Sequence, residues 1–138
     1  MADNTVSTTQ SIAVSALRAQ QSRMRIIAEN MANANSTSKV KGGDPYRRQA
    51  PVFQVTTVAG GGKGVKMTRA EPDKAPFNST YDPNSPSADA TGYVKTPNVD
   101  PLIEAMDMRD AQRAYEANLN VIETIRAMDT RTLDLLKQ

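Results

Sequence analysis

The residues that could carry chemistry are few, and two chemical classes are missing altogether. The 138-residue chain contains no cysteine and no histidine. This removes the usual zinc ligands, thiol nucleophiles, disulfides and the Ser–His or Cys–His pairs of nucleophilic catalysis. The sequence also places no pair of carboxylates in a credible pocket. We therefore expect a protein that is not an enzyme, with no catalytic, cofactor-binding or metal-binding residues.

Two short motifs partly match known ligand loops. The run 60–63 (GGGK) is rich in glycine, but Gly64 stands where a phosphate-binding loop needs Ser or Thr, which favours a hairpin turn. Asp82, Asn84 and Asp89 carry oxygen ligands suited to calcium. The loop lacks the central Gly and the terminal Glu of an EF-hand, so a hydrogen-bonded turn is the better interpretation.

The charge of the chain does not point to a nucleic acid or a membrane. The net charge is only +2, and the basic patch of Tyr46, Arg47 and Arg48, with Lys39 and Lys41 nearby, lacks a recognised binding motif. No stretch approaches the roughly 20 apolar residues of a membrane helix. The first ten residues also lack the basic and apolar regions of a cleaved signal peptide. Any export would then follow another route.

The positions of the helix breakers divide the chain into three parts. All seven glycines and all eight prolines lie between Gly42 and Pro101. Because Pro costs about 3 kcal/mol and Gly about 1 kcal/mol inside a helix, two long terminal helices are predicted. The predicted domains are an N-terminal helix within residues 1–41, a Gly/Pro-rich hairpin and loop segment over 42–100, and a C-terminal helix within 101–138.

The N-terminal helix is predicted to begin near Ser7 or Thr8, because Ser7 and Gln10 have capping-box spacing. Small or apolar residues then recur at heptad spacing and predict one narrow seam, interrupted only by Gln20. The seam consists of Ala13, Leu17, Met24, Ile27, Met31 and Ala34.

The C-terminal helix has a clearer start, because Asp100 can cap it and Pro101 suits the first helical position. From Pro101 to near Leu136 it would be about 54 Å long at 1.5 Å per residue. Its apolar stripe is predicted to contain Met108, Ala111, Tyr115, Leu119, Ile122, Ile125, Thr132 and Leu136.

The two helices are expected to cover one another. Residues 1–41 carry five basic and two acidic side chains, whereas residues 101–138 carry five basic and seven acidic ones. Opposite net charges favour pairing, although exposed ion pairs contribute only about 0–1 kcal/mol each. The predicted fold is mainly α, with the terminal helices paired as an antiparallel coiled coil. Further apolar side chains are left for other partners: Ile26, Val121, Met128, Leu133 and Leu135.

The middle segment contains five of the six aromatic residues. Residues 46–58 and 64–69 are predicted as strands around the glycine turn at 60–62, and residues 77–81 as another short strand. Residues 82–97 are rich in Pro, Asp, Asn and Ser and are predicted to be mostly loop. A sheet this small is marginal without outside support.

Three asparagines, Asn30, Asn33 and Asn35, occur where the first helix must end. Asn is tolerated in the left-handed conformation of helix C-termini, which accounts for one or two of them. Three indicate side-chain amides that bond to neighbouring helices and fix their register. Asn118 and Asn120 on the other helix could act in the same way.

These segments resemble the rod, hook and hook-associated family of bacterial flagellar axial proteins. The N-terminal match covers residues 15–17 (SAL) and 27–35 (IAENMANAN) and is shared across that family. A narrower resemblance to one of its proximal rod members rests on residues 45–48, 81–83, 88–90, 92–94, 97–100 and 113–118. Ser36, Ala50-Pro51 and the 60–64 stretch depart from the usual pattern, which affects the expected hairpin shape.

The resemblance implies a non-enzymatic subunit of the basal-body rod, the hollow drive shaft that transmits torque and encloses the export channel. It implies contacts with copies of itself, with other rod proteins, and with a proximal adaptor at the membrane-anchored ring. It also implies passage through the flagellar type III export apparatus without a cleaved signal peptide, to a periplasmic rod. No cofactor, nucleic acid or direct membrane insertion is expected.

Assembly-interface residues follow from the stripes, the Asn cluster and the motifs of the resemblance. They are Leu17, Met24, Ile27, Asn30, Met31, Asn33, Asn35, Tyr46, Arg47, Arg48, Tyr115, Asn118, Ile122, Ile125 and Leu136. Two alternatives stay open: a secreted type III substrate that acts as a soluble interaction factor, and a basic helical hairpin that binds nucleic acid. The terminal helices are predicted to be largely disordered in the free monomer, because neither is stable alone.

Overall fold

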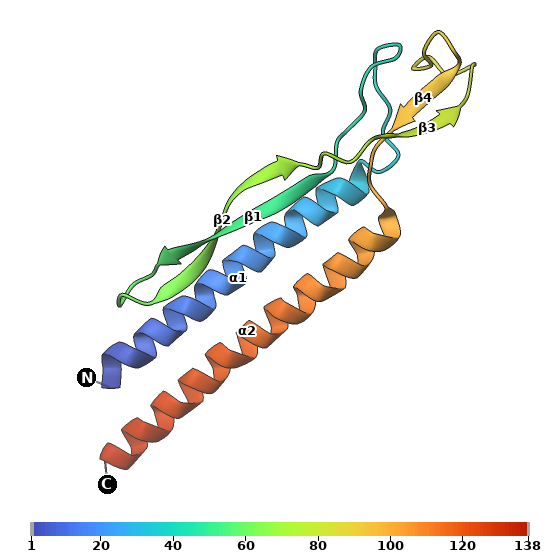
Figure 1. The fold of residues 1–138 in the computed structure, drawn as a ribbon. Coiled ribbons are helices and arrows are strands. Elements are labelled where there is room, and N and C mark those ends of the chain that lie inside the picture. Colours follow the sequence, from blue (N-terminus) through green and yellow to red (C-terminus); the bar gives the residue numbers. More distant parts are fainter. Residues whose placement is uncertain (1, 138) are drawn as a thin grey trace. The chain divides into compact units, whose positions relative to one another are not determined.

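A computed structural model describes residues 2–137, with side chains from residue 5 onward. Met1 and Gln138, the ends of the first and last predicted domains, lie outside the described residues. The elements follow in the order α1 (Ala2–Ala32), β1 (Gln49–Thr57), β2 (Lys63–Pro72), β3 (Asn78–Tyr81), β4 (Tyr93–Thr96) and α2 (Pro101–Leu136) (Figure 1). The predicted class of two long terminal helices around short strands is confirmed; coiled-coil pairing of the helices stays a prediction.

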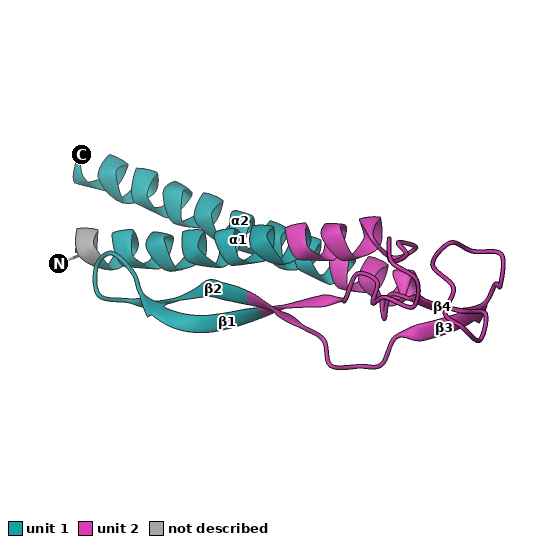
Figure 2. Ribbon diagram, turned by 90° about the horizontal axis from the view of Figure 1, so that it is seen from above, with its two compact units in different colours: residues 1–24, 52–69, 109–138 teal, residues 25–51, 70–108 magenta. Residues whose placement is uncertain are grey.

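The chain divides into two compact units, each built from separate stretches of sequence (Figure 2). Unit 1 contains residues 1–24, 52–69 and 109–138, and unit 2 contains residues 25–51 and 70–108. Both helices and the strands β1 and β2 have residues in each unit. The two units are described separately below.

Of the two helices, only α2 begins where the sequence predicted. The prediction for α2 is confirmed, and the Asp100 carboxylate accepts hydrogen bonds from the backbone N–H groups of Leu102 and Ile103 at 2.9 and 3.5 Å. The predicted start of α1 is wrong, because the helix already begins at Ala2. The hydroxyls of Thr9 and Ser11 donate to carbonyls one turn back and do not cap a new helix.

The first pair of strands lies where the sequence predicted it. β1 and β2 form a two-stranded sheet, and their short connection requires an antiparallel hairpin. Gly60 and Gly61 have φ values of 86° and 81°, which glycine adopts without strain. The Val58 N–H donates to the Gly62 carbonyl at 2.8 Å and closes the turn. The glycine run is therefore a hairpin turn.

The second sheet lies in unit 2, and only one of its two strands was predicted. β3 confirms the predicted strand near residues 77–81, and it pairs antiparallel with β4, so that Tyr81 lies opposite Tyr93. The prediction of mostly loop over 82–97 is wrong for β4. Four residues are too few for alternation to be recognised among so many turn formers; pairing with β3 creates the strand. The rings of Tyr81 and Tyr93 meet edge to face, with centroids 5.2 Å apart.

The core is small and consists mainly of Ala, Ile and Val. In unit 2 it contains Ile26, Ile27, Ala34, Ala88, Val94 and Val99, and in unit 1 it contains Ala13, Ala19, Ala111 and Ile122. Ile26 was predicted to remain on the surface; this is wrong, because only 2% of it is exposed. The exposure predicted for the other four residues is confirmed: Val121 44%, Met128 62%, Leu133 57% and Leu135 74%.

Candidate functional site

Asn30 lies at the C-terminal end of α1 and is the centre of a polar network in unit 2. Its side chain is almost fully buried, with 1% exposed. The amide nitrogen donates to the Gln49 carbonyl at 2.9 Å and to the Glu104 carboxylate at 3.2 Å. The amide oxygen accepts from the Tyr46 hydroxyl at 2.8 Å and from the Gln49 N–H at 2.9 Å. All four hydrogen-bonding positions of the amide are occupied, so it joins α1, β1 and α2.

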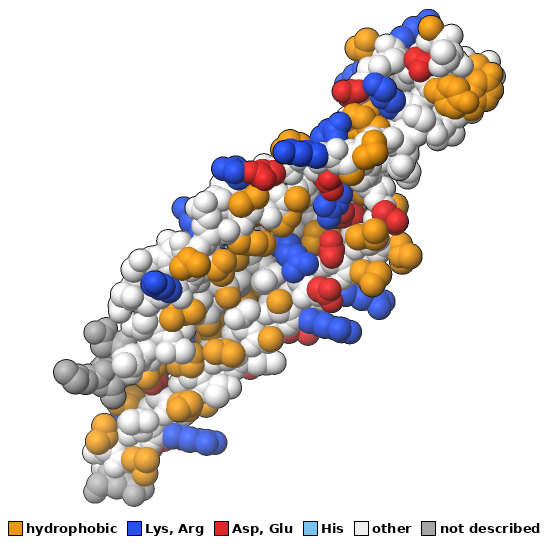
Figure 3. All heavy atoms as spheres, viewed as in Figure 1, with side chains coloured by type: hydrophobic (Ala, Val, Ile, Leu, Met, Phe, Trp, Pro, Cys, Tyr) orange, Lys and Arg blue, Asp and Glu red, His pale blue; other side chains and the backbone are white. Residues whose placement is uncertain are grey.

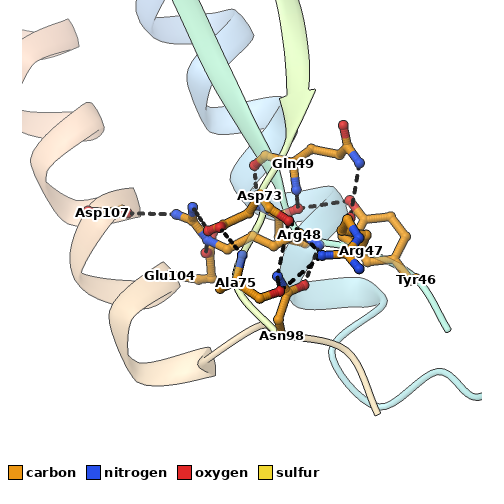
Figure 4. A network of polar contacts seen from close by, with 10 residues as sticks. Tyr46, Arg47, Arg48, Gln49, Asp73, Ala75, Asn98, Glu104 and Asp107 are labelled. Atoms are coloured by element: carbon orange, nitrogen blue, oxygen red, sulfur yellow. Dashed lines mark hydrogen bonds and ion pairs between the residues drawn. The ribbon is translucent and has the colours of Figure 1, made fainter. Parts of the chain in front are cut away.

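Arg48, one residue before β1, meets three carboxylates (Figure 4). Its Nε lies 2.5 Å from an oxygen of Glu104, its Nη1 3.3 Å from Asp73 and its Nη2 3.6 Å from Asp107. The Glu104 side chain is completely buried, so Arg48 and Asn30 are the partners that satisfy its charge. The planar guanidinium carries five N–H donors in a fixed fork, which suits it to a position among three acids better than the single ammonium group of lysine.

The same surroundings perturb two pKa values. Burial tends to lower the pKa of Arg48, but the hydrogen bonds and charges of Glu104 and Asp73 outweigh it and raise the pKa above the ordinary value. The pKa of Tyr46 is raised by burial and by the negative charges of Glu29 and Glu104. Arg48 therefore stays a cation and Tyr46 a neutral hydrogen-bond donor across the whole physiological range.

Arg47 and Asn98 fix the segment that follows β2. The Arg47 guanidinium donates to the carbonyls of Asp73 and Ala75 at 2.8 and 3.0 Å, and it stacks 4.0 Å from the centre of the Phe77 ring. The Asn98 amide donates to the same two carbonyls and accepts from the Arg48 N–H at 2.9 Å. Figure 4 shows these groups converging from the strand, the connecting segment and the first turns of α2.

We call this set the polar hub. It contains Asn30, Tyr46, Arg47, Arg48, Gln49, Asp73, Asn98, Glu104 and Asp107. Chemically it is a set of ion pairs and hydrogen bonds that links α1, β1 and α2. In the described part of the chain, no group of acidic, His or Cys side chains could hold a metal ion. No described helix is long and apolar enough to cross a membrane.

The structure brings four of the predicted interface residues together in the hub: Asn30, Tyr46, Arg47 and Arg48. Asn33 and Asn118 lie elsewhere, and each donates to a carbonyl of its own helix, Glu29 at 2.8 Å and Ala114 at 2.7 Å. Asn35 is exposed. The Asn cluster therefore contains one residue that bonds to the other helix, and Asn30 is that residue.

The remaining predicted residues line the two helices at different depths. Ile27 and Ile122 are buried, and Met31 and Leu136 are 40% and 79% exposed. The half-buried ones are Leu17, Met24, Tyr115 and Ile125. Whether they contact neighbouring molecules stays a prediction.

Sequence reasoning did not select the other five residues of the hub as site residues: Gln49, Asp73, Asn98, Glu104 and Asp107. An acidic residue in the first turn of a helix is favoured by the helix dipole and usually faces water. The place of Glu104 in the first turn of α2 therefore did not by itself suggest that it is buried. The one available signal was its position four residues after the cap Asp100, on the face that also carries Met108 and Ala111. An acid on an apolar helix face predicts a buried cation partner.

Comparison with known proteins decides the family. A family model described as "Flagella basal body rod protein" matches residues 11–38, and one described as "Flagellar basal body rod FlgEFG protein C-terminal" matches residues 90–135. The chain is 46% identical over 134 residues to the flagellar basal-body rod protein FlgC of Agrobacterium fabrum, with 96% of each chain covered. The chain belongs to the FlgC family of flagellar basal-body rod proteins.

Other FlgC proteins support the same placement. The FlgC protein of Salmonella typhimurium is 43% identical over 125 residues, covering 90% of this chain and 92% of its own. That of Bacillus subtilis is 35% identical over 142 residues, covering 91% and 95%. The two family models include Asn30 and Glu104 but not Arg48, which lies between them. FlgC proteins are structural rod components and not enzymes, which agrees with the prediction made from composition.

Proposed function

We propose that this chain is a structural subunit of the flagellar basal-body rod and polymerises through its terminal helices. The observation that carries the proposal is its identity of 35–46% to FlgC rod proteins over nine-tenths or more of the chain. In this proposal residues 1–41 and 101–138 form the axial core, and residues 42–100 fill the space between neighbouring subunits. The core surrounds an export channel and carries torque along the proximal rod.

The outward face of α2 in unit 1 supports an assembly role. Apolar side chains recur there at a spacing of seven residues, the heptad spacing of a helix seam, at Val121, Met128 and Leu135, and they are 44%, 62% and 74% exposed. Ile122, which is buried, lies on another face of the same helix. Figure 3 shows hydrophobic side chains at the surface near the C-terminal end of α2. An exposed seam of this kind is typical of a helix that packs on a second helix in an assembly.

The pairing of α1 with α2 as an antiparallel coiled coil is part of the proposal. The half-buried residues Leu17, Met24, Tyr115 and Ile125 are the side chains that would form its seam. Helices packed side by side resist twisting, because close-packed side chains cannot move past one another without a large loss of contact. This stiffness is the property that a drive shaft needs.

The proposed surroundings follow from the same assignment. The subunit would reach a periplasmic position through the flagellar type III export apparatus, without cleavage of a signal peptide. Its neighbours would be copies of itself, other rod proteins, and the adaptor at the membrane-anchored ring. The assembly contacts would include Met31, Asn35 and Leu136, which are exposed in the single chain.

The test is deletion of the gene in its own host, followed by imaging of basal bodies and swimming assays. We expect loss of rod, hook and filament, restored by the wild-type gene. A copy truncated after Met128 should fail to restore them, because it lacks the end of the exposed seam. As a matched control, Glu123→Ala on a different face of α2 should restore swimming fully. Normal flagella in the deletion strain would instead favour a secreted, soluble interaction factor.

A further inference from the structure

A groove in unit 1 lies between α1 and the β1–β2 hairpin (Figure 2). It consists of two adjacent cavities of about 390 and 430 Å³, which share Ser15, Arg18 and Val58 as lining residues. The stripe of α1 that faces the groove follows steps of four, three and four residues, at Ser11, Ser15, Arg18 and Ser22. Because three of these four side chains are small, the hairpin and the helix leave a hollow between them.

Gly64 holds the hairpin against α1 at the point where the two cavities meet. A Cβ atom at Gly64 would lie 2.4 Å from Ser15 Oγ and 2.6 Å from Val58 Cγ1, so any side chain there would push the strand off the helix. The Ser15 hydroxyl accepts a hydrogen bond from the Val65 N–H at 3.1 Å and donates to the Ile12 carbonyl at 2.7 Å. These contacts set the distance between the two walls of the groove.

The charged side chains that line the groove are all cations. Arg18 lines both cavities and Lys66 lines the first, and no acidic side chain among the described residues lines either one. Both cations are exposed, and neither forms an ion pair with a described residue. Arg48 and Lys95, by contrast, are each paired with acids of the same chain. Since like charges at one cavity repel each other, the groove favours an anionic group between them.

The size and lining of the groove favour a carboxylate carried by a protein over a small inorganic ion. A water molecule takes about 30 Å³ in the liquid, so an ion a few times larger would leave most of the first cavity empty. The remaining walls of that cavity are apolar or carry a hydroxyl group, and they include Ala19, Ser22, Thr56, Val58, Val65 and Met67. Such a lining suits a helix surface on which an acid lies beside apolar side chains.

The end of α2 has this combination of side chains. Leu135 is 74% exposed and continues the seam of Val121 and Met128, and Asp134 beside it is also exposed. Residues 101–138 carry seven acidic and five basic side chains, which complements a groove whose charges are all positive. No described residue of α2 lines either cavity, so the α2 helix of the same chain does not occupy the groove.

We propose that the groove receives the end of α2 from a second copy of this chain, with the Asp134 carboxylate between Arg18 and Lys66. Leu135 then packs on the apolar walls. The inference rests on the proposed function, because it needs copies of the chain to meet in the rod. The contact is heterologous: the groove and the end of α2 are different surfaces, so each copy can offer one and receive the other.

Zero-length coupling in isolated basal bodies tests this contact. A carbodiimide joins a lysine amine to a carboxylate as an amide, with loss of water, where the two groups touch. In wild-type basal bodies we expect a band of twice the mass of the chain on a denaturing gel, with the peptides of Lys66 and Asp134 joined. Lys66→Arg keeps the charge but removes the amine, so the band should disappear while swimming is retained. A joined pair found only at the mass of a single chain would overturn the proposal.

Charge exchange gives a second, independent measurement. Lys66→Glu should reduce swimming, and adding Asp134→Lys to it should restore swimming. Lys63→Glu is the matched control, because Lys63 is an exposed lysine of β2 that lines neither cavity, and it should swim normally. Failure of Asp134→Lys to restore swimming would count against the contact.

The composition of the basal bodies separates failure of this inference from failure of the rod assignment. Basal bodies that contain the chain but no joined Lys66 and Asp134 peptides would overturn the groove contact alone. A link from Lys66 to a different protein would overturn the second copy as the occupant. Basal bodies that lack the chain would refute the rod assignment itself, and the groove contact with it.

Discussion

Arg48 and Glu104 form the pair on which the polar hub depends. Glu104 is completely buried and Arg48 is 22% exposed, so removing either charge leaves the other without its main partner. Breaking a buried pair in this way typically costs about 3–5 kcal/mol, whereas replacing both members together often costs much less. The pair is therefore a strong constraint on substitution even if its net contribution to stability is small.

We predict that Arg48→Met lowers the free energy of unfolding by about 3 kcal/mol or more. Glu104→Gln should cost about 1–3 kcal/mol, because the amide still fills the site. The double variant Arg48→Met/Glu104→Met should lose less than the sum of Arg48→Met and Glu104→Met. Urea unfolding followed by circular dichroism measures all of these, and exposed Arg113→Ala should change stability by less than about 0.5 kcal/mol. Additive losses would show that the two side chains do not interact.

Asn30 should tolerate substitution far less well than its neighbour in the Asn cluster. In Asn30→Asp, a carboxylate oxygen replaces the amide nitrogen that donates to the Gln49 carbonyl and to Glu104. Three hydrogen-bond acceptors then lie together without a donor between them. We expect a loss of about 2 kcal/mol or more in the free energy of unfolding. Asn33→Asp removes one bond to the Glu29 carbonyl and places a charge at a helix C-terminus, which costs about 0.5–1 kcal/mol. Equal losses in the two variants would contradict the central position of Asn30.

At the scale of elements, the loop between β3 and β4 is organised by one carboxylate. Asp89 accepts hydrogen bonds from the backbone N–H groups of Thr91 and Tyr93 at 2.8 and 3.0 Å, and from the Thr91 hydroxyl at 2.7 Å. The Thr91 bonds and the Tyr93 N–H are the main reasons why the pKa of Asp89 is lowered from its ordinary value of 3.8. Each of these bonds favours the charged form.

The pKa of Asp89, followed by NMR, should therefore lie below 3.8, and Thr91→Val should raise it toward that value. Because the folded pKa is lowered, the carboxylate contributes stability above pH 3.8, and this contribution is lost as the pH falls through the folded pKa. Local amide protection at Tyr93 should decline over the same pH range. A carboxyl group at Asp89 that titrates at its ordinary pKa would mean that the loop is not held in this way in solution.

Much of the element structure could be predicted from the sequence, and the hub could not. Pro101 and Asp100 locate the start of α2, and the breaker-free ends predict both long helices, because each of these signals is local. The buried stripe of α1 was only partly found. Ala19, Ile26 and Asn30 are among its most buried residues, yet Ile26 was placed on the surface and Asn30 among the helix-end amides. Their burial follows from long-range packing, which periodicity along one helix does not describe.

The polar hub could not be predicted from the sequence either, because its contacts also depend on long-range packing. The resemblance identified Tyr46, Arg47 and Arg48, and their types alone suggested only a solvated basic patch. Their partners Asp73 and Glu104 are far apart in sequence and lie in segments with no common pattern. A charge pair across such distances requires the tertiary structure, because each charge considered alone is more often exposed than buried.

At the scale of the whole molecule, the chain separates the residues that hold it together from those left for partners. The buried Glu104 carboxylate and the Asn30 amide both serve internal contacts. The outward seam of α2 and the last turns of that helix contribute no buried side chain among the described residues. Substitutions in the two groups should therefore have different consequences, one for folding and the other for assembly.

Truncation after Met128 should leave the monomer about as stable as the wild type, within about 1 kcal/mol, because none of the described side chains removed is buried. The double variant Val121→Asp/Met128→Asp should also leave the stability of the monomer nearly unchanged, since both side chains are exposed. Thermal unfolding of the monomer checks stability, and complementation of the deletion strain checks assembly. We expect normal unfolding and no swimming for both variants. A large loss of monomer stability would mean that these residues serve the fold itself.

The paired tyrosine rings of β3 and β4 provide this protein with an intrinsic spectroscopic probe. The chain has no tryptophan and only four tyrosines, and two of them, Tyr81 and Tyr93, meet with their planes at 63°. Fixed aromatic rings in contact produce a near-ultraviolet circular dichroism signal that disappears when packing is lost. That signal reports on a small sheet in unit 2, far along the sequence from the end of α2. It therefore allows the middle of the subunit to be followed during polymerisation without any attached dye.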